Sequence, residues 1–116
     1  MSESPGKYVF VLQHHNPQFD PMPFSIARTW LDEKGLDLAF YLMYDSIQLM
    51  RREALEQNPE IKDAVDYFLS KGVPIYVCGF CSRACSLTLQ HLYPGVAIGN
   101  RNIFFSLMTE RQPVYY

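Results

Sequence analysis

Residues 73–84 read Val-Pro-Ile-Tyr-Val-Cys-Gly-Phe-Cys-Ser-Arg-Ala, and this stretch contains the pattern that decides the fold. An apolar run over 73–77 leads through a glycine into a segment of helical composition. This pattern is typical of a strand that is followed at once by a helix. All three cysteines of the chain, Cys78, Cys81 and Cys85, lie in or directly after the turn. The stretch therefore predicts one strand–helix unit and points to thiol chemistry at its turn.

The rest of the chain repeats this alternation. Asn58-Pro59-Glu60 is a strong helix start, because it combines a capping residue, a proline at the first position and an acid near the positive end of the helix. Gly35 is a typical helix stop. The expected strands are 7–13, 36–44, 74–78, 96–98 and 113–116, and the expected helices are 24–34, a short one after 45, 59–71, 81–92 and 102–110.

Strands that alternate with helices predict an α/β fold with right-handed crossovers. We expect a three-layer α/β/α sandwich with a flavodoxin-like, mostly parallel five-stranded sheet in the order 2-1-3-4-5. At 116 residues, the chain is long enough for one ordinary core, so we expect a single domain over 1–116 with a flexible tail over 1–6.

Composition excludes several classes of function. The net charge is −2, and no basic run is longer than Arg51-Arg52, which argues against a nucleic-acid surface. The longest apolar stretch, 38–44, is far shorter than the roughly 20 residues that a membrane helix needs. The N-terminal residues lack the pattern of a secretory signal. An odd number of clustered cysteines suits reduced thiols, so we expect a cytoplasmic protein.

The expected strand order also predicts where a ligand would bind. In open α/β sheets, ligands bind at the carboxyl ends of strands where the order reverses, which in the order 2-1-3-4-5 lies between strands one and three. His14 and Asn16 follow the first strand, Tyr44 ends the second and Cys78 ends the third. We therefore expect these residues to meet at one corner of the molecule.

Within the turn itself, the residue types favour an activated thiol. Gly79 allows unusual backbone shapes and close approach of a ligand, and Phe80 lies between the two cysteines of a C-x-x-C pair. Cys81 is expected near the unpaired amides of the first helical turn, and Arg83 adds a positive charge. These features favour a thiolate and would equally hold a persulfide anion. We expect Cys78, Cys81 and Arg83 to carry the chemistry, with Gly79, Phe80, His14, Asn16 and Tyr44 as binding residues.

Other interpretations remain open. The C-x-x-C pair is compatible with a dithiol redox protein, although no Trp precedes it and no Pro lies inside it. A histidine from 14–15 with the two thiols would suit zinc, but no second ligand pair is present, and we expect no metal. The absence of a G-x-G-x-x-G or P-loop motif gives no support for a nucleotide, so we expect no cofactor. We expect Cys85 to pack into the core, and the apolar C-terminal region is a candidate subunit interface.

Residues 76–84, after the Lys-Gly-Val at 71–73, resemble the cysteine motif of the DsrE/DsrF-like (YchN-like) family, and the order of elements over 7–116 is also similar. The resemblance implies a flavodoxin-like sandwich, a persulfide carried by Cys78 and assembly as a homo-oligomer, as trimers or hexamers. We therefore expect a sulfurtransferase-like sulfur carrier that passes sulfane sulfur between donor and acceptor proteins or small sulfane-sulfur compounds. The alternatives are an oligomeric binding module without turnover and a dithiol redox protein.

Overall fold

The computed structural model describes residues 6–116, and the expected tail therefore lies, except for Gly6, outside the described residues. The elements in chain order are β1 (Lys7–Leu12), α1 (Pro21–Lys34), β2 (Asp37–Leu42), η1 (Tyr44–Met50), α2 (Arg52–Glu56), α3 (Pro59–Ser70), β3 (Ile75–Cys78), α4 (Gly79–Ala84), η2 (Leu89–His91), β4 (Ala97–Gly99), α5 (Arg101–Glu110) and β5 (Gln112–Tyr115), where η1 and η2 are 3-10 helices.

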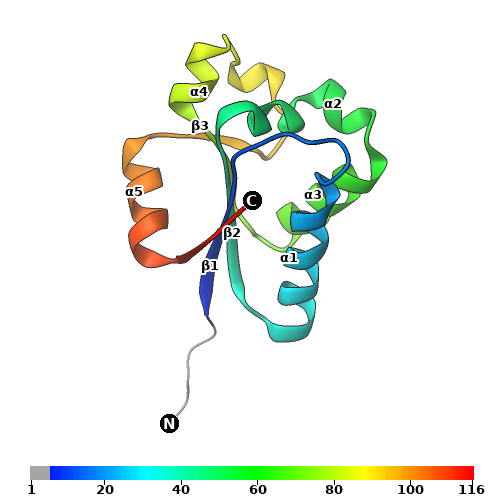
Figure 1. Ribbon diagram of the computed structural model, residues 1–116, viewed down its shortest axis with the longest axis vertical. Helices are drawn as coiled ribbons and strands as arrows, with labels where there is room; N and C mark the ends of the chain where they lie inside the picture. The colour runs from blue at the N-terminus through cyan, green and yellow to red at the C-terminus, as the bar shows by residue number, and fades with distance from the viewer. Residues whose placement is uncertain (1–5) are drawn as a thin grey trace.

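The five strands form one parallel sheet, which confirms the expected α/β sandwich. Figure 1 shows the sheet nearly edge-on, with α1, α2 and α3 on one side and α5 on the other. The segment that contains α4 lies above the carboxyl ends of the strands. The α5 side of the sheet is therefore covered by a single helix.

The strands stand in the order β4-β3-β2-β1-β5, and two neighbour relations differ from 2-1-3-4-5. β2, rather than β1, lies beside β3, and β5 pairs with the free edge of β1. Each step from β1 to β4 moves the chain in one direction, so right-handed crossovers place the intervening segments on one face. The long return from β4 to β5 runs the other way and places α5 on the opposite face. Similar apolar runs do not specify which edge each new strand joins, so the sequence left this open.

The main core lies between the sheet and α1–α3. Phe40 on β2 packs against Phe10, Phe24 and Phe68, with ring centroids 5.0–5.5 Å apart. All four rings are fully buried. Burying one such side chain stabilises a protein by roughly 1.5–3 kcal/mol, so this cluster accounts for much of the stability of the sheet.

Most of the predicted helix boundaries are confirmed. The Asn58 side chain accepts a hydrogen bond from the amide of Ile61 at the start of α3, and Gly35 ends α1 with φ +61°. α4 is much shorter than the expected helix over 81–92. It stops because Ser86 adopts φ +55° and the Leu87 amide bonds back to the carbonyl of Ser82 at 2.8 Å. A serine in this left-handed position carries no recognisable stop signal, since glycine is the usual residue there.

No helix in residues 6–116 has both the length and the apolar character that a membrane crossing requires.

Candidate functional site

Cys78 is at once the last residue of β3 and the N-cap of α4. Its Sγ accepts a hydrogen bond from the Cys81 amide at 3.4 Å, and its carbonyl accepts one from the Ser82 hydroxyl at 2.7 Å. Val77, fully buried on the opposite face, anchors the end of the strand in the main core. The strand thus holds the Cys78 side chain, which is 8% exposed, on the face toward α5.

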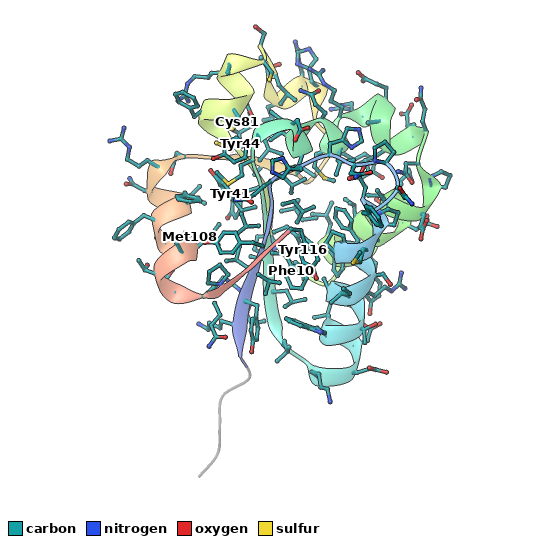
Figure 2. The ribbon with its side chains drawn as sticks, in the orientation of Figure 1. Phe10, Tyr41, Tyr44, Cys81, Met108 and Tyr116 are labelled. Atoms are coloured by element: carbon teal, nitrogen blue, oxygen red, sulfur yellow. The ribbon has the colours of Figure 1, made fainter. Side chains whose placement is uncertain are left out.

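Tyr41, on β2, is the second group at this sulfur. Its hydroxyl acts as a hydrogen-bond donor that lowers the pKa of Cys78, and its ring packs on Phe104 of α5, with centroids 4.9 Å apart. Figure 2 shows Tyr41 on the α5 side of the sheet and Phe10 on the other side. Burial, and then the hydrogen bond to Cys78, raise the pKa of Tyr41, so this hydroxyl keeps its proton and remains a donor.

The pKa of Cys78 is lowered from the ordinary value of a thiol. Burial acts to raise it, but hydrogen bonds from the amide and side chain of Cys81, from Tyr41 and from the amide of Phe80 outweigh burial. Each of these donors favours the thiolate over the thiol. The deprotonated sulfur is the reactive form of a cysteine, so Cys78 has the environment of a nucleophile.

Cys81 is held differently. The Tyr44 amide donates to its Sγ at 3.1 Å, and Tyr44 itself takes the left-handed backbone conformation with φ +54°. Figure 2 shows the two residues side by side above the sheet. Burial raises the pKa of Cys81; the Tyr44 amide opposes this, but the negative charge of Cys78 adds to the rise. Of the two thiols, Cys78 is therefore the one that ionises first.

A cavity of about 240 Å³ opens beside the Cys78 sulfur. It forms where neighbouring strands send the chain to opposite faces: the segment after β3 packs Leu87 and Leu92 into the main core, whereas β4 leads to α5. Such a divergence is the usual place for a ligand in an open α/β sheet. The cavity is lined by Tyr41, Cys78, Gly79, Phe80, Arg83, Gly99, Asn100, Arg101 and Phe104.

Two exposed arginines give this cavity its charge. Arg83 comes from α4 and Arg101 is the first residue of α5, so they approach from the two diverging segments. Within the lining there is no acidic side chain. Phe80, 74% exposed, adds an apolar surface at the rim. The cavity therefore suits a small anion, or an anionic group at the end of a larger partner.

Comparison with known protein families identifies one family that the sequence matches. The sequence matches the DsrE/DsrF-like family over residues 7–112. The chain belongs to this family. The membership that the sequence predicts is thereby confirmed, and it suggests a role of the sulfur-relay type.

The fold is shared with solved structures of low sequence identity. YchN from E. coli is 20% identical, with a TM-score of 0.80 over 96% of this chain and 99% of that one. MTH1491 from Methanobacterium thermoautotrophicum, a protein of unknown function, is 15% identical with the same TM-score and coverage. BT1422 from Bacteroides thetaiotaomicron, also of unknown function, is 12% identical with a TM-score of 0.68 over 95% and 94%. A comparison with curated proteins gives no match.

The site that the sequence predicts is only partly assembled in the structure. Cys78, Gly79, Phe80 and Arg83 line one cavity, with Cys81 adjoining it. Gly79 has no positive φ; it is required because a Cβ would lie 2.5 Å from the carbonyl oxygen of Gly99 on β4. Close packing of the two strand ends, rather than backbone freedom, explains this glycine.

His14 and Asn16 do not join Cys78. They line a separate cavity of about 140 Å³ at the end of β1, where Asn16 orders its own loop by accepting from the Gln18 amide at 3.1 Å. The difference follows from the strand order, since β2 lies between β1 and β3. His14 reaches the thiols only through Tyr44, on whose ring it stacks at 6.3 Å.

Other departures concern the remaining cysteine and the residues that sequence reasoning missed. Cys85 is exposed rather than packed in the core, because α4 ends before it.

Tyr41 and Arg101 were missed, although the alternation of Phe40 and Tyr41 across the sheet would have indicated Tyr41 once β2 was known to neighbour β3. Within residues 6–116, no three His, Cys, Asp or Glu side chains are grouped to hold a metal ion.

Proposed function

We propose that the protein is a sulfur carrier in which Cys78 holds a persulfide and passes sulfane sulfur between partner thiols. One observation supports this above all: Cys78 lines an open cavity and its sulfur accepts a hydrogen bond from the Cys81 amide, while the Phe80 amide and the Tyr41 hydroxyl also favour its thiolate. Sulfur transfer has two steps, uptake from a donor and delivery to an acceptor. Both steps need an anionic sulfur that is open to a partner and stabilised by hydrogen-bond donors.

Uptake begins with the Cys78 thiolate. It attacks the sulfane sulfur of a donor persulfide, a new S–S bond forms at Cys78, and the donor leaves as a thiol or thiolate. In the second half, an acceptor thiolate attacks the outer sulfur and Cys78 departs as thiolate. Arg83 and Arg101 stabilise the negative charge on the outer sulfur or on the donor, and the low pKa of Cys78 makes it a good leaving group in the second half.

The residues at the rim of the cavity indicate what kind of partner it could bind. Phe80 and Arg83 at the rim offer an apolar and a cationic contact for a protein or small compound that bears a sulfane sulfur. Tyr44, 56% exposed, extends this rim toward His14. Exposed Phe105 and Tyr115 on the α5 side support assembly into a homo-oligomer, as a trimer or hexamer. Three free thiols suit the reducing cytoplasm.

Intact mass spectrometry tests the proposal. After incubation with glutathione persulfide and rapid desalting, wild-type protein or its Cys81→Ser variant should gain roughly 32 Da, the mass of one sulfur. Cys78→Ser should gain nothing. Cys85→Ser is the matched control, because it removes the exposed thiol of the same turn and should load like the wild type. Loading of Cys78→Ser to the same extent would refute the assignment.

A further inference from the structure

Cys81 lies one helical turn from Cys78, with its amide bonded to the Cys78 sulfur, and the carrier role leaves the Cys81 thiol unused. The Cys81 amide donates a hydrogen bond to the Cys78 sulfur at 3.4 Å, and the Cys81 side chain is among the groups that lower the pKa of Cys78. Cys81 is half-buried and packs against both hydrophobic clusters of the protein. A carrier needs one sulfur, yet the fold places a second within reach of the first.

We propose that Cys81 is a resolving thiol, which attacks Cys78 once it carries sulfur and releases that sulfur as hydrogen sulfide. This rests on the proposed function, because it begins from the persulfide of Cys78. When no acceptor thiol is present, the protein would then reduce the sulfane sulfur of its donor to sulfide. It would act as a carrier only while an acceptor thiol competes with Cys81.

The reaction balances without an added oxidant. The proton of the Cys81 thiol passes to the outer sulfur of the persulfide, and the Cys81 thiolate attacks the Cys78 Sγ. The bond between the Cys78 Sγ and the outer sulfur breaks, HS⁻ leaves, and a Cys78–Cys81 disulfide forms. The sulfane sulfur gains two electrons, one from each cysteine sulfur. A dithiol reductant of the thioredoxin or dithiothreitol class then restores both thiols.

The charges around the pair explain why the attack follows loading. In the empty site the negative charge on Cys78 opposes ionisation of Cys81. When Cys78 becomes a persulfide, its Sγ is an uncharged divalent sulfur and the negative charge moves outward, toward Arg83 and Arg101. The Tyr44 amide, 3.1 Å from the Cys81 Sγ, then stabilises the Cys81 thiolate more effectively, because the negative charge on the neighbouring Cys78 Sγ is gone.

Geometry also selects Cys81 over the third cysteine. Cys81 lies in the first turn of α4, beside the residue that caps it, whereas Cys85 follows the last residue of that helix and is exposed. The Cys81 amide donates a hydrogen bond to the Cys78 sulfur, and Cys85 is not among the groups that shift the pKa of Cys78. Cys85 therefore provides a matched control for a second thiol in the same turn.

The test follows sulfide and mass together after loading with glutathione persulfide and desalting, with no added thiol. Wild-type protein and Cys85→Ser should carry the additional sulfur directly after rapid desalting. On standing, each should then release about one equivalent of sulfide, measured with a sulfide-selective electrode, and end about 2 Da lighter than the reduced protein. Cys81→Ser should keep its additional sulfur, roughly 32 Da, and release no sulfide. Peptide mapping of the wild type should show the Cys78–Cys81 disulfide.

The outcomes separate the two proposals. If wild-type protein keeps the additional sulfur as stably as Cys81→Ser, the resolving role is overturned and the carrier role stands. Loss of sulfide release in Cys85→Ser instead of Cys81→Ser also overturns it. If neither the wild type nor Cys81→Ser takes up sulfur, and no sulfide appears, the carrier role itself fails.

Discussion

The two faces of the sheet are built from the same strands but have different contents. On the α1–α3 face, Phe10 and Phe40 are completely buried in a continuous aromatic core. On the α5 face, the strands contribute small side chains such as Val9 and Ala39. One helix covers them, and its Phe104 and Met108 are only partly buried.

This difference shows how one β-strand serves both stability and chemistry. Phe40 and Tyr41 are neighbours on β2 and point to opposite faces. The first joins the aromatic core, and the second holds a hydroxyl against the Cys78 sulfur. A thiolate needs polar donors and access, which a close-packed core cannot offer. The thinly covered face therefore accommodates the site, while the opposite face maintains the sheet that positions it.

The largest effect is expected from emptying the aromatic core. Phe40→Ala removes a ring that contacts three others and should lower the free energy of unfolding by about 3–5 kcal/mol. Urea titration followed by circular dichroism measures this. The alkylation rate of Cys78 in the molecules that remain folded should change little. A loss below about 1 kcal/mol would show that the two faces share the stability more evenly than their packing indicates.

A smaller loss of stability, combined with a loss of reactivity, is expected where the two strand ends meet. Gly79→Ala places a Cβ 2.5 Å from the Gly99 carbonyl oxygen, so β3 and β4 must separate. We expect about 1–3 kcal/mol of destabilisation, together with slower alkylation of Cys78. Gly35→Ala is the control: its φ of +61° predicts a loss of about 1 kcal/mol at the end of α1, with Cys78 unaffected. Unchanged stability in Gly79→Ala would contradict the close contact.

These features also show how far the sequence could predict the molecule. Elements were predictable because their signals are local: the cap at Asn58 and the stop at Gly35 both act as expected. The short α4 was not, because Ser86 takes a conformation that its residue type does not announce. Placing Cys78 at a strand end that begins a helix was likewise a local inference and is confirmed.

The composition of the site depended on long-range pairing, which the sequence did not reveal. The strand order brings β2 and β4 beside β3, so Tyr41 and Arg101 reach the cavity and His14 does not. Which edge a strand joins depends on the sum of packing over the whole sheet and not on any one residue. The thiols were therefore found from the sequence, whereas their partners required the structure.

The next effect concerns reactivity alone. Tyr41→Phe keeps the ring and removes the hydroxyl that donates to Cys78. A hydrogen bond to a charged group contributes about 1.5 kcal/mol or more, so alkylation of Cys78 by iodoacetamide at pH 7 should slow by roughly tenfold. Without the donor, the thiol keeps its proton to higher pH, and the midpoint of the pH–rate profile should move upward. The difference between variant and wild type should shrink above both midpoints.

Tyr76→Phe is the matched control for this measurement. Tyr76 lies on the same face of the neighbouring strand β3 but is not a donor to the Cys78 sulfur. Its variant should keep the wild-type profile, as read from the Cys78 peptide by mass spectrometry. An identical shift in both variants would mean that the ring environment, and not the Tyr41 hydroxyl, controls the thiol.

The smallest effect on stability is expected on the outer surface of α5, where a second copy of the chain in the proposed oligomer would add to the thin cover of this face. Phe105 is 67% exposed, so Phe105→Ser should change the free energy of unfolding of the monomer by at most about 0.5 kcal/mol. If the α5 side is the subunit contact of the proposed oligomer, the molar mass from light scattering should fall. Leu89→Ser, which removes a similarly exposed side chain from η2, should leave the mass unchanged. A fall in molar mass only for Phe105→Ser would assign the subunit contact to the α5 face, next to the cavity of Cys78. No change would show that this face is not the subunit contact and is open to solvent and to the sulfur partners.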